Sequence, residues 1–126
     1  MKKAADGAHA ELTEKIIGCC FTVANELGVG FIEKVYENAV VHELRKGSLN
    51  VVQQNPLAVH YDGVVVGEFF LDVVVEGSVI VELKAVSELN NFHEAQCLNY
   101  LKASGLHTCL LINFGQSRLK VRRFSL

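Results

Sequence analysis

The sequence has no tryptophan, one proline and one methionine, and it lacks an excess of charge of either sign. Its 126 residues include 12 Lys and Arg against 14 Asp and Glu, which gives a formal net charge of −2 at pH 7. Such a chain has no global positive field that attracts a polyanion, so composition argues against a nonspecific nucleic-acid coat protein. Half of the residues are hydrophobic and 21% are charged, which excludes a disordered chain and indicates one globular domain over residues 1–126.

Zinc-type ligand spacing is also missing from the sequence. The four cysteines form no C-x-x-C pair, and the five histidines do not recur at zinc-finger intervals, so we expect reduced thiols. The start, "MKKAADGAHAELTE", lacks the apolar core of a signal peptide, and no hydrophobic run approaches membrane-spanning length. We therefore expect a cytoplasmic protein with no membrane partner and no small-molecule organic cofactor.

The sequence does contain two helical stretches followed by a set of strands. Apolar residues recur every three or four positions over 12–27 and 31–46, and the glycines in "GVG" separate the two stretches. The later periodicity predicts three strands, one helix and two further strands. Because a helix joins the third and fourth strands, these two should be parallel within a mixed sheet, which is an α/β fold. The predicted strands are 51–61, 64–75, 79–86, 107–114 and 118–124, and the helix is 90–105.

The third of these strands, "VIVELKAV" at 79–86, carries two charges within an apolar run. Glu82 and Lys84 share one face because side chains alternate along a strand, and Asp72 interrupts the preceding apolar strand. Burying unpaired charges is costly, whereas a divalent cation bound by the two carboxylates would account for them. A structural ion pair with a spare acid would account for them as well, and so would a solvated stripe on the sheet.

The turn between these strands decides whether the acids can meet. A two-residue turn would pair Asp72 with Leu83 and place the acids on opposite faces of the sheet, whereas a three-residue turn, "EGS" at 76–78, pairs Asp72 with Glu82. The site hypothesis requires the three-residue turn or a compensating bulge.

Two helices add polar residues near the same strands. His93, Gln96 and Tyr100 fall at i, i+3 and i+7, on one helical face. Glu33 and Tyr36 form an i, i+3 pair directly after the glycine turn. Each is an ordinary helix residue when taken alone, since first-turn acids are favoured by the helix dipole and tyrosines often pack in cores. Convergence on one pocket would give them a shared role.

Four segments resemble one family in order and in predicted structure. They are "GFIEKVY" (30–36), "LDVVV" (71–75), "VELKAV" (81–86) and "HEAQCLNYLK" (93–102). Together they resemble the GxxExxY proteins of the PD-(D/E)XK nuclease superfamily, and the Q-x-x-x-Y pattern is similar to the RecB-like branch. The resemblance implies a restriction-endonuclease-like αβββαβ core, with helices flanking a mixed sheet, an extra N-terminal helix and a C-terminal edge strand.

The resemblance also implies a set of site residues. Asp72 and Glu82 would bind Mg²⁺, or Mn²⁺ as a substitute, with the backbone carbonyl of Leu83 as a third ligand. The implied catalytic residues are Glu33, Asp72, Glu82, Lys84 and Gln96, with Glu33 orienting a metal-bound water and Lys84 as the catalytic lysine. The implied substrate-binding residues are Tyr36, His93 and Tyr100. Leu71 stands where the superfamily's name has proline.

Three functions remain open on the sequence. The complete acid–acid–lysine set favours a Mg²⁺-dependent nuclease that acts on DNA or RNA by attack of a metal-bound water. The small size and mildly acidic charge favour a catalytically silent binding or regulatory module, and a partner subunit in a defence or toxin–antitoxin system is the third. "RLKVRR" at 118–123 fits a phosphate contact but also a charged edge strand that resists aggregation. A homodimer is compatible with each.

Overall fold

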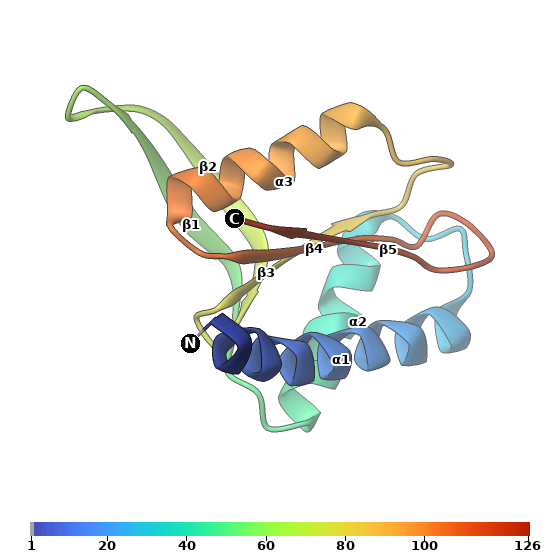
Figure 1. The fold of residues 1–126 in the computed structure, drawn as a ribbon. Helices are drawn as coiled ribbons and strands as arrows, with labels where there is room; N and C mark the ends of the chain where they lie inside the picture. Colours follow the sequence, from blue (N-terminus) through green and yellow to red (C-terminus); the bar gives the residue numbers. More distant parts are fainter. Residues whose placement is uncertain (1) are drawn as a thin grey trace.

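The computed structural model describes residues 2–126, with side chains from residue 9 onward. Three helices and one five-stranded sheet make up the chain (Figure 1). In chain order they are α1 (Lys2–Leu27), α2 (Glu33–Lys46), β1 (Val51–Tyr61), β2 (Val64–Val75), β3 (Val79–Lys84), α3 (Asn91–Ser104), β4 (Thr108–Asn113) and β5 (Lys120–Ser125). This order confirms the predicted α/β fold.

The sheet is mixed and helices cover both of its faces (Figure 1). Its strand order is β1-β2-β3-β4-β5; β3 and β4 are parallel, and the other neighbouring pairs are antiparallel. One core cluster packs α1 and α2 against one face, and a smaller cluster packs α3 against the other. The crossover through α3 therefore has the predicted role of bringing two parallel strands together.

The β2–β3 turn has the length that the site hypothesis requires. Val73 pairs with Val81 and Val75 with Val79, so 76–78 is a three-residue turn. Glu76 and Gly77 both have positive φ, which the tight turn needs. Asp72 and Glu82 come next in the same register, so of the two turn lengths considered, the chain has the one that sets these acids opposite each other.

Most boundaries lie within two residues of the predicted ones, and two differences, at the start of α1 and the end of β3, have identifiable causes. Helix α1 begins at Lys2 rather than near residue 12, because residues 2–11 are rich in helix-forming Ala, Lys and Glu although they lack an apolar stripe. Strand β3 ends at Lys84 rather than at 86. There the Asn113 side chain accepts a hydrogen bond from Val86 N (3.0 Å) and donates one to Val86 O (2.9 Å), so a side chain takes over the backbone pairing that a strand would provide.

The β1–β2 hairpin continues past the body of the molecule as a projecting arm (Figure 1). We call residues 57–70 the hairpin arm. Its tip has only exposed residues over 60–66. All four cysteines are free, and no helix among the described residues has the length and apolarity to cross a bilayer.

Candidate active site

Asp72 and Glu82 lie opposite each other where β2 and β3 separate. The backbone N–H of Asp72 donates to Oε2 of Glu82 at 2.9 Å, and the backbone N–H of Leu83 donates to Oδ2 of Asp72 at 2.9 Å. Side-chain carboxylates thus replace the ladder hydrogen bonds beyond the Val73–Val81 pair. The other oxygen of each carboxylate makes no hydrogen bond with any residue that the structure describes.

Burial and mutual repulsion favour the protonated forms of this acid pair. Glu82 is 4% exposed, and desolvation, followed by the charge of Asp72, raises its pKa to about 8. Burial also raises the pKa of Asp72, although the hydrogen bond from Leu83 N opposes the change. Two adjacent carboxyl groups with raised pKa values are typical of a functional site and also of a site that a cation would neutralise.

Lys84 is the cation nearest to this pair along the chain. It lies two residues after Glu82 on β3 and is partly exposed. Its positive charge opposes, without cancelling, the rise that burial causes in the pKa values of both acids. The ion pairs between described residues are Lys34–Glu37, Lys46–Glu43 and Arg122–Glu94. Lys84 takes part in none of them, so its ammonium group is available to a bound anion.

Helix α2 contributes Glu33 from its first turn. Oε2 of Glu33 accepts a hydrogen bond from Ala85 N at 3.3 Å, directly after Lys84, and the charge of Glu33 is among the causes that raise the pKa of Asp72. The glycine turn before the helix brings it there, because Gly30 adopts φ 115°, which only glycine accommodates without strain. Glu33 therefore lies at the margin of the acid pair.

Tyr36 is fully buried and bonded within its own turn. Its hydroxyl donates to Gly28 O at 2.6 Å and accepts from Phe31 N at 3.2 Å. Its ring stacks on Phe114, with centroids 4.6 Å apart. The structure gives Tyr36 a role in holding the turn before α2, and the buried ring offers no surface for the substrate contact that the resemblance implies.

Glu37 belongs to the site's surroundings, although the sequence pattern did not single it out. It is 4% exposed, and its carboxylate accepts hydrogen bonds from Gln53 Nε2 (2.6 Å), Gln54 Nε2 (3.0 Å) and Lys34 Nζ (2.9 Å). Its charge is another cause that raises the pKa of Asp72. The i, i+4 spacing from Glu33 would have placed it on the same helix face, but only the fold brings the glutamines of β1 to it.

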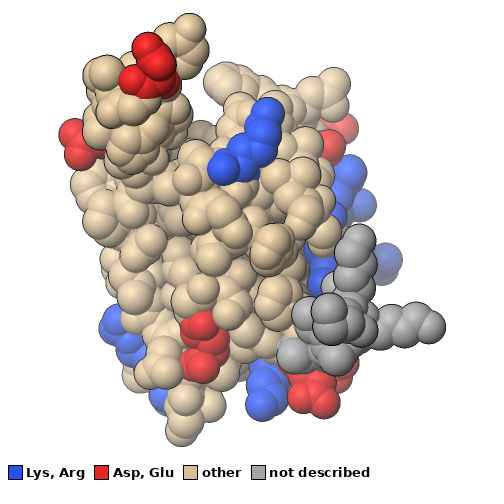
Figure 2. All heavy atoms as spheres, turned by 60° about the vertical axis from the view of Figure 1, so that its left-hand side comes forward, with Lys and Arg blue, Asp and Glu red and all other residues tan. Residues whose placement is uncertain are grey.

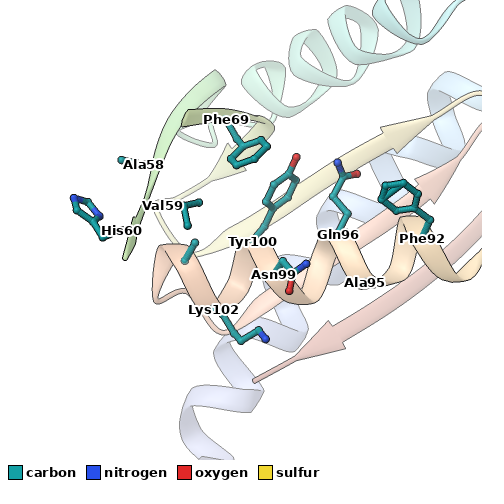
Figure 3. Close-up of a pocket in the computed structure, with 11 residues that line it drawn as sticks. Ala58, Val59, His60, Phe69, Phe92, Ala95, Gln96, Asn99, Tyr100 and Lys102 are labelled. Atoms are coloured by element: carbon teal, nitrogen blue, oxygen red, sulfur yellow. The ribbon is translucent and has the colours of Figure 1, made fainter. Parts of the chain in front are cut away.

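Helix α3 covers the other side of the acid pair. Tyr100 is mostly buried, and burial together with the charges of Glu82 and Asp72 raises its pKa to about 12. Gln96 and Tyr100 both line a groove of about 710 Å³ between α3 and the hairpin arm, and Figure 3 shows their side chains directed to the same side of the helix. His93 instead forms the N-terminal capping box of α3 with Asn90, so its ring is already engaged.

The two carboxylates suit a hard divalent cation whose coordination shell is completed by other oxygen ligands. Two carboxylates on adjacent strands supply oxygen donors, and a cation would relieve their repulsion. No group of three or more His, Cys, Asp or Glu side chains comes together as a metal site within the described part of the chain. Mg²⁺ commonly takes one or two carboxylates plus water and substrate phosphate, which is a fit for Asp72 and Glu82.

The family model described as PD-(D/E)XK nuclease superfamily matches residues 10–124. This range covers α1 from residue 10 onward, α2, the strands β1 to β4, α3 and β5 up to residue 124. No curated protein and no solved structure matches the sequence. The matched segment contains every residue of the site described above.

Proposed function

Because the chain belongs to the PD-(D/E)XK nuclease superfamily, we propose that it is a Mg²⁺-dependent phosphodiesterase that cleaves DNA or RNA. The observation that carries the proposal is the reciprocal anchoring of Asp72 and Glu82 at the end of two strands, with Lys84 beside them. If these charges served only a structural ion pair, Lys84 would form a salt bridge with Asp72 or Glu82. No such salt bridge forms between described residues.

Within the superfamily we place the chain with the GxxExxY proteins and the RecB-like branch. Three residues support the first assignment through separate structural tasks: Gly30 forms the turn, Glu33 reaches the end of β3, and Tyr36 holds the turn in place. Gln96 and Tyr100 support the second because they share the face of α3 that borders the groove.

The proposed roles follow from the position of each side chain. Asp72 and Glu82 would hold Mg²⁺ or Mn²⁺, with the carbonyl of Leu83 as a further candidate ligand. When bound, such a cation polarises the phosphate and makes water more acidic. Lys84 would stabilise negative charge that develops on the phosphate. Glu33 and Gln96 would orient the attacking water and the substrate, and Tyr100 would contact the phosphate side.

The test combines cleavage with metal binding in the same proteins. We expect the wild type to cleave single- or double-stranded DNA or RNA with Mn²⁺, and Asp72→Asn and Glu82→Gln to lose this activity. Millimolar Mg²⁺ or Mn²⁺ should raise the wild-type melting temperature by mass action on the folded state. Asp72→Asn should melt higher than the wild type without metal, because repulsion is removed, and should lose the response to metal.

The outcomes separate the proposal from its alternatives. Equal cleavage by wild type and variants would show a contaminating nuclease. A wild type that binds metal but cleaves none of the four substrates would support a silent binding or regulatory module, as in a defence or toxin–antitoxin partner. A melting temperature that metal leaves unchanged would contradict the metal site itself.

A further inference from the structure

The hairpin arm carries apolar side chains that its own chain leaves uncovered. Phe69 and Phe70 are consecutive in β2, so they point to opposite faces of the arm, yet both are exposed. Tyr61 and the three valines at 64–66 are exposed as well. Helix α3 adjoins only one face of the arm (Figure 3). An arm that is apolar on both faces is therefore only half covered within one molecule.

The groove beneath the arm continues this apolar surface. Its lining includes Phe69 from the arm, Tyr100 in the middle of α3 and Phe92 near the start of α3 (Figure 3). Tyr61, Phe69, Phe70 and Phe92 are between 45% and 76% exposed. Since an aromatic side chain presents about 150–250 Å², these four leave on the order of 500 Å² uncovered, and the valines add to it. A protein–protein interface of standard size buries about 800 Å² of accessible surface on each partner.

Charge distinguishes the two edges of the sheet. The outer strand β5 carries Lys120, Arg122 and Arg123, which would repel a second copy of the same edge. The other outer strand, β1, has no Asp, Glu, Lys or Arg in its 11 residues. Figure 2 shows the face on which the arm lies, with a broad uncharged area that is interrupted by one basic group near its upper centre and one acidic group below. Of the two outer strands, only β1 lacks the charged side chains that normally keep a sheet edge from associating with another chain.

These features fit a second copy of the chain better than a nucleic acid. The charged residues of the arm are Asp62 and Glu68, which would repel phosphates, and a nucleic-acid site needs cations for them. Lys102 lines the groove and is opposite in charge to the two acids of the arm, so an arm of a second copy is not repelled there. A two-fold axis matches one patch with the same patch. Pro56 lacks the N–H for continuous strand addition along β1, so the contact would be made by side chains.

We propose that two copies of this chain associate about a two-fold axis, with the hairpin arm of each copy seated against the groove between arm and α3 of the other. This inference goes beyond the proposed function and does not depend on it. It has one consequence for the site: Gln96 and Tyr100 line the groove, so the partner's arm would lie beside the substrate that these two residues are proposed to contact.

The test is the mass of the full chain in solution, measured in EDTA so that metal binding and cleavage play no part. Sedimentation equilibrium over about 1–100 µM, the range in which weak interfaces of this size dissociate, should give an average mass that rises with concentration toward twice the chain mass of 13.9 kDa. Phe70→Lys and Val65→Lys, both at exposed positions, should give the monomer mass. Phe21→Lys is the matched control, because Phe21 is also exposed but lies on α1, and it should remain dimeric.

Hydrogen exchange provides a readout that needs no variant. Amides of the wild-type arm, residues 57–70, should become more protected as protein concentration rises, while those of β5 should not. A wild type with the monomer mass throughout, or a dimer that Phe70→Lys and Val65→Lys leave intact, would overturn the proposal. A monomer that binds a single-stranded oligonucleotide and loses this on Phe92→Ala would also overturn it, and would assign the groove to unpaired bases.

Discussion

The Glu82 carboxylate accepts a hydrogen bond from the backbone N–H of Asp72 at 2.9 Å, and the Asp72 carboxylate accepts one from the residue after Glu82. Each acid thus binds the backbone of the other acid's strand. The arrangement holds both carboxylates in place without a cation and leaves their repulsion unrelieved. The free energy of unfolding of the metal-free protein therefore depends on the same two carboxylates that are proposed to bind the metal ion.

The first prediction concerns pH and the metal-free protein. Glu82 has a folded-state pKa of about 8, above its ordinary value of 4.5. Between these values the unfolded chain binds fewer protons than the folded one, so stability falls as pH rises from about 4.5 to about 8 and then levels off. The raised pKa of Asp72 acts in the same direction.

Thermal melts in EDTA between about pH 5 and pH 9 would measure this dependence. Because roughly 1 kcal/mol shifts Tm by about 4 °C in a domain of this size, the wild type should lose several degrees more than Glu82→Gln, which cannot ionise. Parallel Tm curves for the two proteins would show that Glu82 ionises normally in the folded state.

The second prediction separates metal binding from chemistry at Lys84. Lys84→Ala should leave metal binding intact or tighten it, because a competing cation is removed. Cleavage should nevertheless fall by about two to three orders of magnitude, as when another donor to the transition state is removed. Lys84→Arg should restore little, since a planar guanidinium places charge differently from an ammonium.

Calorimetric titration with Mn²⁺ beside a cleavage assay would test this split. Lys15→Ala is a suitable control, because Lys15 is an exposed lysine on α1 without a proposed role in chemistry. If Lys84→Ala lost metal binding and activity together, Lys84 would be a structural partner of the acids and its catalytic role would be wrong.

The third prediction concerns the buried carboxylate of Glu37. Glu37→Ala should lower the free energy of unfolding by about 1–3 kcal/mol, because it leaves Gln54 without its acceptor and Gln53 with Asn38 Oδ1 alone. Glu37→Gln, which retains an acceptor oxygen, should cost less. Urea denaturation would measure both.

Glu43→Ala offers the control on the same helix. Glu43 pairs with Lys46 at 3.2 Å in a more exposed position, and exposed pairs contribute about 0–1 kcal/mol. Equal losses from Glu37→Ala and Glu43→Ala would mean that the network around Glu37 does not contribute as its burial implies.

The fourth prediction concerns Gly115 and the segment that follows Lys84. A Cβ at Gly115 would overlap Val86 O and lie 2.5 Å from Val86 N, and this backbone is already held by Asn113. Gly115→Ala should therefore displace the loop between β3 and α3 and lower the melting temperature. Activity should fall with it, because that loop adjoins Glu33 and Lys84.

Gly18→Ala is the matched control for this substitution. A Cβ at Gly18 meets nothing within 4 Å, and an alanine within α1 should add about 0.5–1 kcal/mol of stability. A Gly115→Ala protein that melts like the wild type would show that the loop can move aside without cost.

The sequence by itself determined the order of elements and the parallel pairing of β3 with β4, and it tied the pairing of Asp72 with Glu82 to the length of one turn. These depend on local quantities: apolar periodicity, turn length and the alternation of side chains along a strand. Glu82 and Lys84 were identifiable because charged residues are conspicuous within an apolar strand.

Only the tertiary structure decided which helix residues are buried and which face the site. Glu37 resembles any surface glutamate in the sequence, and Tyr36 resembles a site tyrosine, because burial depends on what another segment brings against the helix. Gln53 and Gln54 on β1 bury Glu37, and Phe114 covers Tyr36. The exposed arm has the same origin: its residues have the pattern of a buried strand, and only the fold shows that α3 adjoins one face of the arm and leaves these side chains exposed.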